Sequence, residues 1–163
     1  MTKNKASAVD EEGPRHVARD PDFEARVRAS FAKQPMMETL GATLDEVEPG
    51  RVTIVMPPAP HILQQHGFVH GGAVAAIADS AAGYAALSLM PKGAGVLTTE
   101  FKINLLAPAS GDRLVATGMV IRAGRSLTVA MAEVHSETAG ALKLVALLTA
   151  SMMTIEGRDG VSD

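Results

Sequence analysis

Residues 64–90, QQHGFVHGGAVAAIADSAAGYAALSLM, decide the fold of this chain, because they join a glycine-rich turn to a long apolar run. From Ala73 to Met90 nearly every side chain is small or apolar, which predicts a helix buried on most of its surface. Asp79 breaks the pattern. An ionised carboxylate in such surroundings is costly unless it is paired, and carboxylates with a shifted pKa occur often at sites of chemistry. Asp79 is therefore the first candidate for a functional residue.

The segments before this run predict one short helix and one hairpin. In residues 21–34 apolar side chains recur at helical spacing, and Pro35 ends the pattern. A brief helical or turn segment follows at 36–40. Around Pro49-Gly50, a strong turn signal separates two extended runs, which indicates a hairpin.

After the helix the period of the apolar residues changes from helical to two. Between Leu97 and Leu105 the odd-numbered residues are expected to face one way, and Thr98 to share the polar face with its even-numbered neighbours. Strands are predicted at 113–122, 126–136 and 141–155. The fold class is α+β, with a hairpin, one buried helix and a four-stranded antiparallel meander wrapped around it. Long sheet edges invite pairing, so we expect at least a homodimer.

Length and composition restrict the function. The 163 residues suit one domain at 21–155, between a flexible N-terminal segment (1–20) and a C-terminal tail (156–163). The absence of Cys excludes disulfides, thiolate metal sites and a cysteine nucleophile. A net charge of -3 without a basic run argues against nucleic-acid binding. The polar N-terminus predicts a cytoplasmic protein, and Asp79 within the apolar run argues against a membrane span.

A motif in this stretch resembles the hotdog-fold acyl-CoA thioesterases of the phenylacetate-degradation (PaaI-like) type. That motif has Asn or Gln, two residues, Gly, two residues, His-Gly-Gly, and an acidic residue nine positions after the His. Its positions are filled here by Gln64, Gly67, His70, Gly71, Gly72 and Asp79. The likeness continues through TTEFKINLLAPA (98–109) and RAGRS (122–126), and it covers roughly residues 38–155.

The chemistry of a thioester fits these residues. Its carbonyl oxygen gains negative charge during attack, so a site needs N–H donors there and a nearby base or nucleophile. Gly71 in the first helical turn offers a free N–H, and Asp79 would activate water or attack directly. Eight residues of helix separate the two by about 12 Å, too far for one carbonyl to contact both. The residues must come from different subunits, and the resemblance likewise implies a site at a dimer interface.

The resemblance implies further roles. Gln64 would orient the carbonyl or the water, His70 would shape the loop, and Thr98 would position the water. Four residues lie in segments that resemble coenzyme A contacts, where cationic side chains would suit phosphates: Asn104, Arg122, Arg125 and Ser126. No cofactor is expected other than coenzyme A as part of the substrate.

Simpler interpretations stay open for each residue. Taken alone, Asp79 also fits the role of a buried structural carboxylate. His70 also fits the role of a residue that caps the helix or packs beside it. The two arginines that flank the predicted turn would fit solvated charges. His61, His66 and His70 are candidates for a metal site, but no Cys and no helical His pair accompany them, so we expect no metal.

The sequence therefore predicts hydrolysis of small or medium acyl-CoA or aryl-CoA thioesters by a homodimer, or by a dimer of dimers. The alternatives are a non-catalytic acyl-CoA-binding hotdog protein and, as a third hypothesis, a dehydratase of the same fold. The sequence specifies neither the acyl group nor whether Asp79 acts as nucleophile or general base.

Overall fold

Most of the apolar run forms the longest helix among the described residues, as predicted, but the helix ends at Leu87 and not at Met90. The computed structural model describes residues 16–158 and 160–161, and its helix α3 spans Gly71–Leu87. His70 is the N-cap residue, and its ring Nδ1 accepts the N–H of Gly72 at 2.9 Å. The two glycines thus join the first turn, and the helix begins before the apolar run does.

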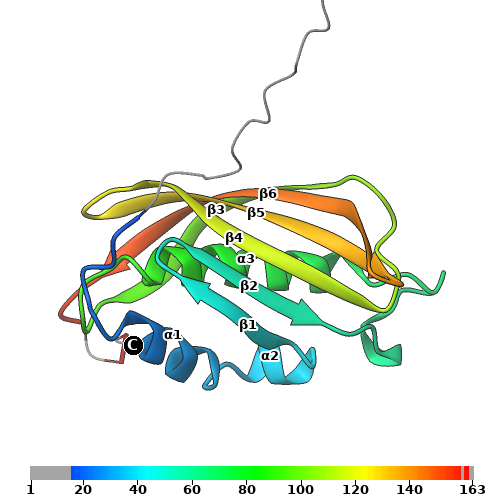
Figure 1. Cartoon of the computed structure of the whole chain (residues 1–163), viewed down its shortest axis with the longest axis horizontal. Coiled ribbons are helices and arrows are strands. Elements are labelled where there is room, and N and C mark those ends of the chain that lie inside the picture. The colour runs from blue at the N-terminus through cyan, green and yellow to red at the C-terminus, as the bar shows by residue number, and fades with distance from the viewer. Residues whose placement is uncertain (1–15, 159, 162–163) are drawn as a thin grey trace, which may run out of the picture.

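A six-stranded antiparallel sheet curves around α3 (Figure 1). Two short helices, α1 (Phe23–Phe31) and α2 (Pro35–Thr39), lie beside the first strand, and a 3-10 turn, η1 (Pro60–Ile62), precedes α3. The strands are β1 (Thr43–Glu48), β2 (Arg51–Met56), β3 (Gly95–Leu105), β4 (Arg113–Ala123), β5 (Leu127–Thr138) and β6 (Ala141–Ile155). The predicted hairpin is the β1–β2 pair, and the predicted fold class is confirmed.

The predicted four-stranded meander is wrong in one respect. The strands lie in the order β1-β2-β4-β5-β6-β3, so β3 pairs with β6 and not with β4. The hairpin occupies the edge of β4 that a meander would have given to β3, since β2 pairs with β4 throughout its length. As a result β3 is an edge strand, and α3 is enclosed by strands that precede it and strands that follow it in the chain.

The predicted alternation of β3 is also wrong, because the strand contains a bulge. Leu97 pairs with Met153 and Phe101 pairs with Ala150, so these two apolar side chains lie on opposite faces of the sheet. The register shift moves Thr98 onto the face that also carries Phe101, which is the face covered by α3. Thr98 therefore does not share the polar face of the strand with its even-numbered neighbours.

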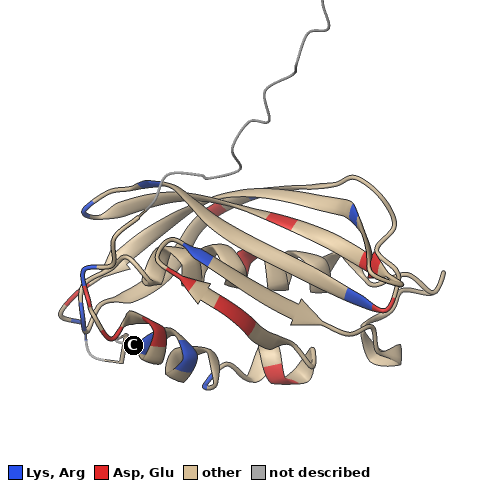
Figure 2. Ribbon diagram, viewed as in Figure 1, with Lys and Arg blue, Asp and Glu red and all other residues tan. Residues whose placement is uncertain are grey.

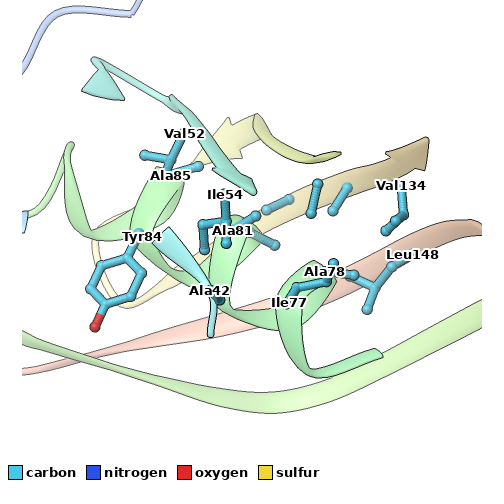
Figure 3. Packing of buried hydrophobic residues seen from close by; sticks show 14 of the residues in the cluster. Ala42, Val52, Ile54, Ile77, Ala78, Ala81, Tyr84, Ala85, Val134 and Leu148 are labelled. Atoms are coloured by element: carbon cyan, nitrogen blue, oxygen red, sulfur yellow. The ribbon is translucent and has the colours of Figure 1, made fainter. Parts of the chain in front are cut away.

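The backbone of α3 packs directly on β4. At Gly118 an added Cβ would collide with the carbonyl group of Ala81 and the nitrogen of Ala82. Alanines of α3 contact Ile54 and other aliphatic side chains of the sheet, whereas Tyr84 turns its hydroxyl away from this cluster (Figure 3). Small residues on both elements thus let the helix approach the sheet closely.

The N-terminal helix closes the other end of α3. The guanidinium of Arg26 donates to the carbonyl oxygens of Leu87 and Met90 at 3.2 and 2.9 Å, and it pairs with the buried carboxylate of Asp20 at 3.0 Å. A cation at this end also suits the helix dipole. Acidic and basic residues are interspersed over the sheet and the short helices (Figure 2). Within the described residues, no helix is long and apolar enough to cross a membrane.

Most of the predicted N-terminal segment, residues 1–20, lies outside the described residues. The division into segment, domain and tail stays a prediction.

Candidate active site

Asp79 lies on the side of α3 that faces the edge strand β3, where Asp79 and Ser80 are only half-buried, and we call this the open side of the helix. The hydroxyl of Thr98 donates to its Oδ1 at 2.8 Å and also contacts the Sδ of buried Met152 at 3.2 Å. Burial raises the pKa of Asp79 above its usual value of 3.8, and the hydrogen bond from Thr98 offsets part of this rise. The pair combines a carboxylate with a hydroxyl that holds it in place, and the bulge in β3 makes this contact possible.

A cleft of about 460 Å³ opens above this carboxylate, and we call it the Asp79 cleft. It runs along α3 between the end of α1 and the start of β3. Its lining residues are Ser30, Lys33, Gln34, Asp79, Ser80, Gly83, Tyr84, Val96, Leu97 and Thr98.

A second cleft, of about 470 Å³, lies at the beginning of α3, and we call it the Gly71 cleft. Gln64 and Leu105 also line it. The loop before the helix is held tightly, since the N–H of Gln64 donates to the carbonyl of Phe68 at 2.8 Å and Gly67 adopts a φ of 82° that suits glycine. Among the described residues, the N–H of Gly71 has no hydrogen-bond partner. This cleft therefore offers a free N–H at the positive end of the helix dipole.

The structure does not bring Asp79 and Gly71 together within one chain. They are separated by two turns of α3, about 12 Å, and they line different clefts. Gln64 lies with Gly71, and Thr98 lies with Asp79. The predicted site residues are therefore divided into two pairs.

His70 has a structural role as the cap of α3. Its Nδ1 accepts the N–H of Gly72, which requires the proton of a neutral ring to lie on Nε2. The Nε2 of His61 is hydrogen-bonded to the carbonyl of Thr39 at 2.9 Å. In the part of the chain that the structure describes, no group of three or more His, Asp or Glu side chains could hold a metal ion.

The residues predicted to contact coenzyme A are exposed, and they lie in two places. Arg122, Arg125 and Ser126 lie at or beside the β4–β5 turn, which the strand register places at the same end of the sheet as Thr98. Asn104 lies six residues further along β3, roughly 20 Å away at 3.3 Å per residue. Three of these residues thus lie at the Thr98 end of the sheet, with β6 between their turn and β3, and the fourth lies toward the Gly71 cleft.

Sequence reasoning missed part of the Asp79 cleft. Ser30, Lys33 and Gln34 come from the end of α1 and the segment after it, and they reach the cleft through long-range packing. Tyr84 is the only tyrosine of the chain, within an otherwise apolar helix, so its position was a signal that the sequence did offer.

A long helix wrapped by a curved antiparallel sheet is the hotdog fold, and its clefts hold the carboxylate and N–H donor that thioester hydrolysis needs. The sequence profile described as the Thioesterase superfamily matches residues 66–142. A crystal structure of a thioesterase family protein from Silicibacter pomeroyi is 47% identical, with a TM-score of 0.81, and the match covers 83% of this chain and 99% of that one.

Two further relatives agree. The PaaI protein of the phenylacetic acid degradation operon of Escherichia coli is 26% identical, with a TM-score of 0.75 over 83% of this chain and 95% of that one. A medium/long-chain acyl-CoA thioesterase of Escherichia coli is 25% identical over 63% of this chain and 76% of its own length. The chain belongs to the thioesterase superfamily, and it is a thioester hydrolase.

Proposed function

We propose that this protein hydrolyses acyl-CoA thioesters at sites shared between two copies of the chain. The observation that carries the proposal is the division of the reactive groups between two clefts, with Asp79 and Thr98 in one and Gly71 and Gln64 in the other. A two-fold axis would set the Asp79 cleft of one subunit against the Gly71 cleft of its partner, and would produce two equivalent sites. The similarity to the medium/long-chain acyl-CoA thioesterase of E. coli supports an acyl-CoA substrate.

The edge strand β3 supports a second copy as the missing half. Among the described residues no strand pairs with its outer edge, and its apolar side chains Leu97, Phe101 and Leu105 are 45%, 45% and 57% exposed. Bare apolar edges of this length are normally paired or covered. Pairing of two β3 strands would also bring the open sides of the two α3 helices toward each other.

In the proposed reaction the carbonyl oxygen of the thioester accepts the N–H of Gly71. Asp79 of the other subunit then takes a proton from water, or attacks the carbonyl carbon to form an anhydride that water hydrolyses. The C–S bond breaks in either route, and coenzyme A leaves as a thiolate while the acyl group leaves as a carboxylic acid. Thr98 holds the carboxylate, and Gln64 orients the carbonyl or the water.

The coenzyme A part would lie across both subunits. Arg122 and Arg125 carry the positive charges that phosphate groups require, and Ser126 adds a hydroxyl beside them. Asn104 would come from the opposite subunit, since it lies near the Gly71 cleft of its own chain.

The helix start allows a sharp test of the oxyanion donor. Gly71 is the first helical residue, and the residue before it has φ -62° and ψ 136°, so proline fits at position 71 while it removes the N–H. Gly71→Ala is the matched control, because it keeps the N–H and adds a Cβ at 2.8 Å from the flexible end of Leu105. We expect Gly71→Pro to reduce kcat by about 10²-fold or more relative to Gly71→Ala.

Mixing of two inactive variants then tests the shared site. Asp79→Ala subunits are co-expressed with Gly71→Pro subunits, and the mixed dimers are assayed with acyl-CoA esters. We expect about one quarter of the wild-type activity, because half of the dimers are mixed and each mixed dimer holds one intact site. If activity stays at the level of the separate variants, the two residues do not serve one shared site.

A further inference from the structure

The hydroxyl of Thr98 has more acceptors beside it than its single proton can serve. It lies 2.8 Å from Oδ1 of Asp79 and 3.2 Å from Sδ of Met152, and both atoms accept hydrogen bonds. A threonine hydroxyl carries one proton and two lone pairs, so it makes a well-aligned hydrogen bond to only one of these acceptors at a time. The carboxylate and the sulfur therefore compete for one proton.

The sheet places Met152 for this contact. Met152 is directly opposite Thr98 in the ladder between β3 and β6, and its side chain is 0% exposed on the face that α3 covers. Its neighbour Met153 points to the other face of the sheet and is 41% exposed. Because a fully buried side chain does not contact a substrate in the cleft, any effect of Met152 on the reaction passes through Thr98.

The charge of Asp79 decides which acceptor receives the proton. An ionised carboxylate is a much stronger acceptor than a thioether, so the hydroxyl donates to Asp79 while the carboxylate is charged. Burial raises the pKa of Asp79, and this hydrogen bond offsets part of the rise. The other titratable residues among those that line the cleft are Lys33, which is exposed, and Tyr84, whose hydroxyl accepts from Gln34.

We propose that Met152 is a positioning residue whose sulfur accepts the hydroxyl proton of Thr98 when Asp79 loses its charge. The proposal rests on the proposed function, in which Asp79 takes a proton from water or is acylated. The hydroxyl then turns to Sδ of Met152, and its lone pairs become available to the carboxyl group and the cleft. In this orientation the oxygen of Thr98 accepts from the protonated carboxyl group, or from the water that hydrolyses the anhydride. One hydroxyl thus holds the carboxylate first and serves the next step afterwards.

Met152→Leu tests the proposal, because it removes the sulfur and nearly preserves the volume of the side chain. The matched control is Met153→Leu, the same change at the adjacent residue on the opposite face. Without the sulfur the neutral carboxyl group loses support, so the titration midpoint of Asp79 should fall by about 0.5 pH unit in Met152→Leu. Carbon NMR of the carboxyl group measures this midpoint. We also expect kcat to fall about threefold or more with little change in KM, and Met153→Leu to change neither quantity.

Thr98→Val provides a second control, because it removes the hydroxyl that links the sulfur to the carboxyl group. In a Thr98→Val background, the further change Met152→Leu should leave the midpoint and kcat where Thr98→Val alone puts them. A methionine that only fills the core would lower the thermal stability in both backgrounds and leave the midpoint at its wild-type value, and this result would overturn the proposal. If the wild type hydrolyses no ester, the proposed function fails, and the NMR titration still tests the role of the sulfur.

Discussion

The two sides of α3 use small residues for opposite purposes. On the side that faces the sheet, the backbone at Ala81 and Ala82 lies so close to Gly118 that β4 has no room for one methyl group. On the open side, Gly83 has no atom within 4 Å of the place where a Cβ would be, and Asp79 lies one turn away. Glycine permits contact in the first case and preserves space in the second.

This difference separates the residues that hold the fold from those that leave room for a substrate. The packed side consists of aliphatic groups that the sheet buries completely. Substitutions there should therefore lower the free energy of unfolding. The open side holds the half-buried carboxylate of Asp79, whose pKa is raised by burial. The ionised carboxylate therefore does not stabilise the folded chain. One helix thus carries both the centre of the core and the chemistry.

The largest effect is expected from a methyl group on the packed side. Gly118→Ala should lower the free energy of unfolding by about 3 kcal/mol or more, because the new Cβ would collide with backbone atoms of α3 that cannot rotate away. Urea denaturation followed by circular dichroism measures the change. The result that would contradict close packing is a variant as stable as the wild type.

The main elements of this fold were predictable from local patterns. The apolar run gave α3, and the signal at Pro49-Gly50 gave the β1–β2 hairpin, since both depend on residues close in sequence. The place of β3 at the far edge was not predictable, because strand pairing depends on partners distant in the chain. The bulge near Thr98 was missed for the same reason, as it exists only relative to the register of β6.

The candidate site was predictable where one segment holds its residues. Gly71 and Asp79 lie in one motif, and their separation along the helix already indicated two subunits. The contact between Thr98 and Asp79 follows from the bulge, so no local pattern in the sequence could predict it. The hydrogen bond between Gln34 and Tyr84 was missed because it forms only after the N-terminal segment packs against α3.

A methyl group on the open side should have the opposite and smaller effect. Gly83→Ala should raise the free energy of unfolding by about 0.5–1 kcal/mol, because alanine favours the helix and nothing opposes the new Cβ. The same methyl group should narrow the Asp79 cleft, so KM for acyl groups long enough to pass position 83 should rise. Urea denaturation and a series of acyl-CoA esters measure the two effects. If Gly83→Ala is less stable than the wild type, the space beside Gly83 is occupied in the folded protein.

The smallest effect concerns the charge of Asp79. Burial raises the pKa of this carboxyl in the folded state above the 3.8 of the unfolded chain, so the unfolded chain loses its proton first as the pH rises. Below pH 3.8 both states are protonated and the group has no effect on stability. As the pH rises through the folded pKa, stability is lost, and above it the loss is constant.

Asp79→Asn keeps the shape and removes the titration, so it should be more stable than the wild type at pH 7. The advantage should shrink as the pH falls toward 3.8, since the wild-type carboxyl then becomes neutral as well. We expect a small difference, because the carboxylate is partly exposed and the hydroxyl of Thr98 already compensates it. Unfolding free energies of both proteins between pH 4 and 7 measure it, and other titrating groups cancel in the comparison. A difference independent of pH would mean that the open side of α3 does not perturb its carboxylate, and the contrast between the two sides would then be one of packing alone.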